Sequence, residues 1–145
     1  MEALISVFTK DLNKLKEEVL SYDSEDALFA IAEGITNSGG NLAMHLNGNL
    51  QHFIGAILGK TKYVRNREEE FSGRFSREQI VSDIEESISV VSKTIASLSS
   101  EELSSPYPEK IFGGEMKTDF FLYHLLGHLN YHLGQVNYHR RLTTK

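Results

Sequence analysis

The sequence has no cysteine, which excludes disulfide bonds and metal sites built from thiolates. It also lacks any window close to the roughly 18 apolar residues of a membrane span. The amino-terminal segment has no basic region followed by an uninterrupted apolar stretch, so we expect no signal peptide. These absences predict a soluble protein in the reducing cytoplasm.

Clustered positive charge is missing as well. The formal net charge is −5 at pH 7. A nucleic-acid partner would require a clustered basic face to neutralise its phosphates, and an anionic membrane surface is disfavoured for the same reason. We therefore expect that the protein binds neither nucleic acid nor a membrane.

The chain is long and apolar enough to bury one core. It has 145 residues, and 40% of them are hydrophobic. A chain of this length fits a single domain with its own core, so we predict one domain over residues 1–145.

Four segments have apolar residues at spacings of three and four, which predicts four long helices. These helices are expected over residues 2–20, 38–58, 76–98 and 118–142. Residues 27–35 have room for one short helical turn. No segment alternates like a strand, and we therefore predict an all-α, four-helix up-down bundle.

Several residues mark the expected helix ends. Ser38 is a candidate N-cap, and Gly59 is a candidate C-terminal cap. Residues 76–79 have the form of a capping box. The charged segment 60–75 and the segment 99–117, which holds both prolines, are expected connections, the latter with a turn at 100–103.

All six histidines fall in the second and fourth predicted helices. Residues 124, 128 and 132 step round the fourth helix by about 40° each and form one stripe. Histidines four apart can chelate one ion, so the pair is either His124 with His128 or His128 with His132. The natural third ligand is His45 on the second helix. Three imidazoles leave coordination positions open, which is typical of catalytic metal sites.

Three segments resemble motifs of the DinB/YfiT-like superfamily. Residues 128–135 resemble its last-helix motif, which is a histidine pair four apart followed closely by Gly-Gln. Residues 41–50 resemble its second-helix pattern, Asn-Leu-x-x-His-Leu-x-Gly-Asn. Residues 65–71 are similar to a recurring segment of one DinB-like branch. The order and spacing of the motifs agree from about Asn37 to Leu142.

The resemblance implies a four-helix bundle with a long crossover connection, a divalent metal ion and frequent homodimers. Carried over by position, its metal ligands are His45, His128 and His132. The implied ion is zinc or nickel, with iron or manganese as alternatives. His124 is not part of the usual pattern. Three roles remain open for it: a group behind the metal ligands, a substrate contact, or no role at all.

Other polar residues near these motifs have simpler expected roles. His52 and His139 fit ordinary surface or flank positions. The cluster of Arg65, Arg67 and Glu70 is expected to form ion pairs that hold the connection on the bundle. A ligand imidazole usually donates its second N–H to an oxygen. We expect at least one ligand to use a backbone carbonyl or a side-chain amide in this way, and the candidate amides belong to Asn41, Asn49 and Gln135.

The last long connection contains apolar and amphipathic side chains that must pack on something. These residues are Tyr107, Ile111, Phe112 and Met116. We expect them first to cover the end of the bundle, with a dimer contact or a pocket wall as the alternatives. The free coordination position of the metal is expected to face a pocket lined partly by residues 99–117.

The resemblance leaves the reaction open between two enzyme classes and a binding role. Some relatives are thiol S-transferases and others are described as metal-dependent hydrolases. Hydrolysis usually also needs a carboxylate base, and no Asp or Glu lies next to the three ligands in sequence. We therefore expect transfer of a low-molecular-weight thiol to an electrophile, with hydrolysis or a non-catalytic stress-response module as the alternatives.

Overall fold

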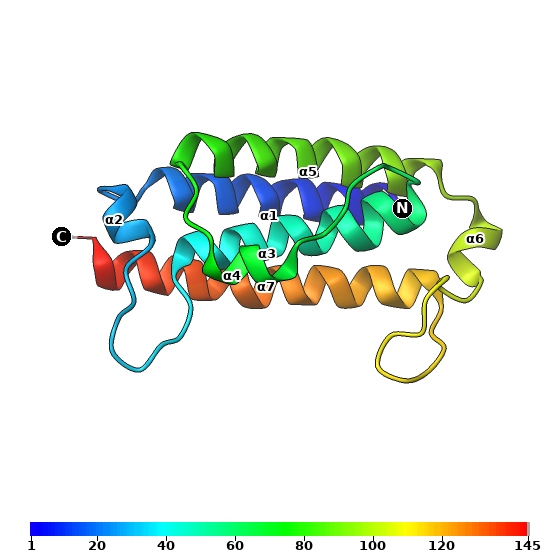
Figure 1. Cartoon of the computed structure of the whole chain (residues 1–145). Helices are drawn as coiled ribbons and strands as arrows, with labels where there is room; N and C mark the ends of the chain where they lie inside the picture. Colours follow the sequence, from blue (N-terminus) through cyan, green and yellow to red (C-terminus); the bar gives the residue numbers. More distant parts are fainter. Residues whose placement is uncertain (145) are drawn as a thin grey trace.

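The computed structural model describes residues 1–144 and is a bundle of four long helical segments (Figure 1). The long segments are α1 (Glu2–Leu20), α3 (Gly39–Leu50) with its π-helical continuation η1 (Gln51–Leu58), α5 (Arg77–Ser97) and α7 (Thr118–Thr143). Three short helices lie in the connections: α2 (Glu25–Leu28), α4 (Arg67–Ser72) and α6 (Ser100–Ser104). The predicted all-α, four-helix fold is confirmed.

The direction of the helices explains the long crossover. In Figure 1, α1 and α7 run one way along the bundle, while α3 and α5 run the other way. The chain between η1 and α5, residues 59–76, therefore returns along the length of the bundle and includes α4. This segment is the crossover connection that the resemblance implies.

Each long helix packs against two others around one apolar core. α1 packs against α5 and α7, and α3 packs against the same two helices. The apolar stripe predicted for the first helix is buried at Leu4, Phe8, Leu12, Leu15 and Val19. Because α3 and α7 are neighbours, the two histidine-bearing helices lie side by side. Within the described residues, no helix is both long and apolar enough to cross a membrane.

The predicted serine caps are present at both helix starts. The Ser38 hydroxyl accepts a hydrogen bond from the backbone N–H of Asn41, and the Ser76 hydroxyl accepts one from Gln79. The reciprocal half of the capping box is replaced, because the Gln79 side chain donates to Asp83 instead.

Gly59 caps η1 as predicted, although not in the left-handed conformation of a typical glycine cap, and the short helices fall close to their expected positions. Gly59 follows η1 with a φ of −83°, and the left-handed residue is Lys60, with a φ of 55°. Gly59 is required for a different reason: a Cβ there would lie 2.4 Å from Oγ1 of Thr94 on α5. The helical turn expected within 27–35 lies earlier, at Glu25–Leu28, and the turn expected at 100–103 is α6.

Candidate metal centre

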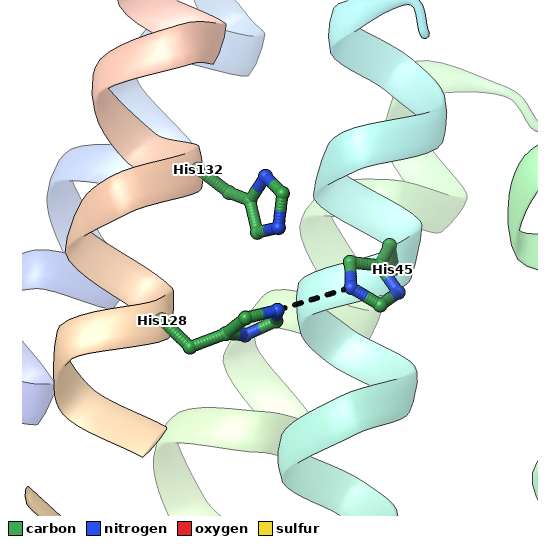
Figure 2. Close-up of side chains that lie close together, drawn as sticks. All are labelled: His45, His128 and His132. Carbon is green, nitrogen blue, oxygen red and sulfur yellow. Dashed lines mark hydrogen bonds between the residues drawn. The ribbon is translucent and has the colours of Figure 1, made fainter. Parts of the chain in front are cut away.

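Three histidines from α3 and α7 face one another across the bundle (Figure 2). His45 projects from α3, and His128 and His132 project from successive turns of α7. The Nε2 atoms of His45 and His128 are 3.2 Å apart, and one ring nitrogen from each histidine lies within 4.8 Å of the other two. We call these three residues the histidine cluster.

His124, the alternative member of the i, i+4 pair, lies outside the histidine cluster. Its ring stacks on Phe121 with the centroids 5.9 Å apart, and it contacts the edge of Phe112 at 5.0 Å. The spacing within α7 is four residues in both histidine pairs and so does not distinguish them. The structure distinguishes them through the position of His45 on the neighbouring helix.

The second ring nitrogen of His45 is held by a buried carboxylate. Its Nδ1 lies 2.9 Å from Oε2 of Glu70, which is on α4 and is only 4% exposed. An imidazole that donates Nδ1–H to this carboxylate leaves the Nε2 lone pair directed toward His128. Metal-binding histidines are usually oriented in this way, by a carboxylate or carbonyl behind the ring.

Glu70 is itself fixed by polar groups from two segments. Arg65 donates to both of its carboxylate oxygens, from Nε at 2.7 Å and from NH2 at 2.9 Å. The Asn41 side-chain amide donates to the backbone carbonyls of Glu70 and Gly73, at 3.1 and 2.8 Å. Burial would raise the pKa of Glu70, but the hydrogen bonds from His45 and Arg65 outweigh it and hold the pKa below 4.5. The carboxylate is therefore ionised at neutral pH.

This arrangement extends the role expected for the charged connection. The predicted ion pair exists between Arg65 and Glu70, and it holds the crossover on the bundle. Sequence reasoning missed that Glu70 also contacts His45. Arg67 takes no part in this ion pair, because its guanidinium lies over the ring of Phe71, 5.3 Å from the centroid.

His132 is oriented by an amide, as expected for at least one ligand. Its Nδ1 lies 2.6 Å from Oε1 of Gln135, one turn along α7. Nδ1–H donates to this oxygen, so the Nε2 lone pair is left for a metal. The other two candidate amides do not play this part: Asn41 binds backbone carbonyls instead, and the Oδ1 atom of Asn49 has no partner among residues 1–144.

His128 and His132 are neutral at physiological pH. Burial, followed by the charges of neighbouring groups, lowers the pKa of His128 to about 4. Burial also lowers the pKa of His132, although its bond to Gln135 acts in the opposite direction. The Nδ1 atom of His128 is buried without a partner in the described part of the chain. Neutral imidazoles keep the lone pairs that divalent metals bind, so the donor set fits such an ion.

A cleft of about 260 Å³ opens beside His45 and His128. We call it the histidine cleft. Its other lining residues are Asn49, Phe53, Arg65, Arg67, Ile111, Phe112, Phe121, His124 and Leu125. No carboxylate lines it within residues 1–144.

The last long connection contributes to this cleft in part. Ile111 and Phe112 line it, whereas the Tyr107 hydroxyl donates to the backbone carbonyl of Phe53 at 2.9 Å and Met116 packs on the core. Tyr107 and Met116 therefore cover the bundle, as expected first, while Ile111 and Phe112 form a pocket wall, which was the alternative.

The two remaining histidines have structural surroundings. His139 is buried rather than on the flank, and its ring nitrogens lie 2.7 Å from the Tyr22 hydroxyl and 2.8 Å from the carbonyl of Ala30. His52 contacts the ring of Phe53. Neither belongs to the histidine cluster.

Comparisons with known proteins agree with this architecture. The family model of the DinB superfamily matches residues 8–136. The crystal structure of a DinB-like protein from Bacillus cereus is 19% identical in sequence and has a TM-score of 0.76, with 98% of this chain and 91% of that chain covered. At this identity the likeness shows the fold alone. No curated protein matches the chain.

Proposed function

The chain belongs to the DinB superfamily, and from this premise we propose that it is a metal-dependent enzyme that transfers a low-molecular-weight thiol to an electrophilic small molecule. His45, His128 and His132 would hold the divalent ion. The convergence of their ring nitrogens, and the contacts of Glu70 with His45 and of Gln135 with His132, support this assignment. Nitrogen donors favour zinc or nickel, with iron or manganese as alternatives.

A bound divalent cation supplies one chemical effect, which is to lower the pKa of a coordinating thiol until it is a thiolate at neutral pH. The residues of this chain have a supporting role. Glu70 and Gln135 orient the rings of His45 and His132, at 2.9 and 2.6 Å. The histidine cleft would admit the substrates next to His45 and His128.

The observation that favours thiol transfer over hydrolysis is the lack of a carboxylate in the histidine cleft, within residues 1–144. Activating a water for hydrolysis usually requires a nearby general base. Glu70 cannot serve, because its oxygens are occupied by Arg65 and by Nδ1 of His45, on the opposite side of the ring from Nε2. A thiolate nucleophile needs no such base.

The experiment is an assay of protein purified without an affinity tag and analysed for bound metal. The protein is incubated with cysteine and an electrophile such as 1-chloro-2,4-dinitrobenzene, and loss of free thiol is followed. Release of nitrophenol from nitrophenyl acetate is measured in parallel. His128→Ala should lose both metal and thiol transfer, whereas His52→Ala, on the adjacent π-helical segment, should keep both. Ester release alone would indicate a hydrolase, and metal without either activity would indicate a binding module.

We also propose that two copies of this chain associate through α7. One face of the helix exposes large apolar residues at spacings of three to eight positions: Phe120, Tyr123, Tyr131, Tyr138 and Leu142. Two glycines between them, Gly127 and Gly134, meet no atom within 4 Å of a built Cβ among the described residues. Aromatic side chains of one copy could pack at the glycines of the other.

Sedimentation velocity tests this association. Wild type should sediment as a dimer, and Tyr131→Ser should shift it toward monomer. Val64→Ser is the matched control, because Val64 is 87% exposed on the crossover connection and borders a pocket with no α7 residue in its lining. A wild-type monomer, or an unchanged dimer after Tyr131→Ser, would contradict the proposed surface.

A further inference from the structure

The polar lining of the histidine cleft has one charge sign, opposite to that of the whole protein. The chain has a net charge of −5, yet the charged side chains that line the cleft are Arg65 and Arg67, and no carboxylate of residues 1–144 lines it. A concave site with charge of one sign concentrates ligands of the opposite sign. The cleft is therefore suited to an anionic small molecule.

The two arginines differ in what their charges already contact. Arg65 is bound to both oxygens of Glu70, and its side chain is 13% exposed. Arg67 has no carboxylate partner in the described chain. Its guanidinium is held over the ring of Phe71, and this contact positions the group while leaving its N–H donors free. Arg67 is thus the guanidinium in the cleft that can take a carboxylate.

A buried amide in the same cleft also has no partner. Asn49 lies on α3 one turn after His45 and is 7% exposed. Its Oδ1 atom is buried and accepts no hydrogen bond from residues 1–144. An unsatisfied buried acceptor is unfavourable, which indicates that a ligand group completes this site.

The outer wall of the cleft is an aromatic ring in an unfavourable setting. Phe112 is 76% exposed, and its backbone has a φ of 56°, a region that favours glycine. Its ring stands edge-on to His124 at 5.0 Å. A ligand body lying in the cleft would cover this ring.

From these four observations we propose that the histidine cleft binds a small mercapto acid, with the thiol directed toward the histidine cluster and the carboxylate bound by Arg67. This inference rests on the proposed thiol transfer and names the class of its thiol substrate. The Oδ1 atom of Asn49 accepts a hydrogen bond from a hydroxyl or amino group next to the carboxylate, because a thiolate and a carboxylate offer no donor themselves. Phe112 packs on the carbon chain of the ligand.

The test compares two thiols of nearly the same size and shape, 3-mercaptopropionate and 3-mercaptopropionamide, of which only the first carries a carboxylate. Each is titrated into the cobalt-substituted full-length protein, and binding is measured from the sulfur-to-cobalt absorption band. Wild type should bind the acid at least about tenfold more tightly than the amide. Arg67→Gln should abolish this preference by weakening only the acid. Arg74→Gln should preserve it, because Arg74, on the same connection as Arg67, is already ion-paired with Asp26 of α2.

Equal affinity for the two thiols in wild type, or an undiminished preference in Arg67→Gln, would overturn the carboxylate site. Absence of an absorption band with both thiols would instead overturn the proposed thiol chemistry. In that case the carboxylate site is tested separately from the thiol chemistry. Butyrate and butyramide are titrated into the zinc-loaded protein, and binding is followed by the NMR shifts of the histidine rings. A preference for butyrate that Arg67→Gln removes supports the carboxylate site, and no preference overturns it.

Discussion

The carboxylate of Glu70 occupies the space that a side chain on Gly48 would need. A Cβ built on Gly48 would lie 2.0 Å from Oε1 of Glu70. Gly48 is on α3, nearly one turn after His45, so its missing side chain lets α4 bring its carboxylate against the helix. The 2.9 Å contact between Glu70 and His45 depends on this glycine.

Replacing this glycine should therefore weaken metal binding. Gly48→Ala is expected to displace the Glu70 carboxylate and to lower zinc affinity about 10–100-fold, the usual effect of losing a group behind a ligand. Competition with a chromogenic chelator measures the affinity. Gly114→Ala is the control, because Gly114 lies on the last long connection and no described atom lies within 4 Å of its built Cβ. It should leave zinc affinity unchanged, and equal losses in the two variants would contradict the role of Gly48.

The two groups behind the ligands should differ in importance. Glu70 is buried and ionised, whereas Gln135 is exposed, so water can replace its oxygen after substitution. We expect Glu70→Gln to lower zinc affinity more than Gln135→Leu does, with helix content unchanged in both by circular dichroism. Glu69→Gln is the control, because Glu69 is the exposed neighbour of Glu70. A larger loss in Gln135→Leu than in Glu70→Gln would reverse this ranking.

Phe112 allows binding to be separated from stability. Its φ of 56° suits glycine, so Phe112→Gly should leave the melting temperature unchanged or higher while removing the ring from the histidine cleft. Binding of 3-mercaptopropionate should weaken several-fold. Met116→Ala is the contrasting variant, because Met116 packs on the core and its loss should lower the melting temperature with little effect on binding. A lower melting temperature in Phe112→Gly would mean that the ring is structural.

The long helices could be predicted from sequence because each buries a continuous apolar stripe. The first was predicted over residues 2–20 and is Glu2–Leu20. The periodic pattern itself does not give the helix directions, since it is the same whichever way a helix runs, and the long crossover was implied only by the resemblance. The parallel course of α3 and α5 depends on residues 59–76, whose charged sequence shows no periodicity.

The candidate metal site could also be predicted only in part from the sequence. Spacing on α7 gave two possible histidine pairs, and only the resemblance chose His128 with His132. Glu70 was missed as a partner of His45 because the six residues of α4 are too few for a periodic pattern. Its 25-residue separation from His45 becomes a contact only through the crossover. The unpartnered Asn49 also has no signal in sequence, since it depends on three-dimensional packing.

Acid stability should depend on a buried carboxylate outside the histidine cluster. Glu18 on α1 is 3% exposed and accepts hydrogen bonds from Asn137 at 2.8 Å and from Arg140 at 2.5 Å, both on α7. Burial would raise its pKa, but these bonds hold the pKa below 4.5. Because the folded pKa is the lower one, the ionised group stabilises the fold above pH 4.5. This contribution is lost as the pH falls through the folded pKa.

Glu18→Gln should therefore lower the free energy of unfolding at pH 7 by about 1–3 kcal/mol, the usual range for hydrogen bonds to a charged group. The difference from wild type should shrink steadily as the pH is lowered from 5 to about 3, as expected from linkage. Urea unfolding followed by circular dichroism measures both quantities. Glu17→Gln, on the exposed neighbour that contacts Lys14, should change the free energy by less than about 0.5 kcal/mol. A difference between Glu18→Gln and wild type that stays constant with pH would mean that Glu18 acts through packing, because packing does not depend on its charge.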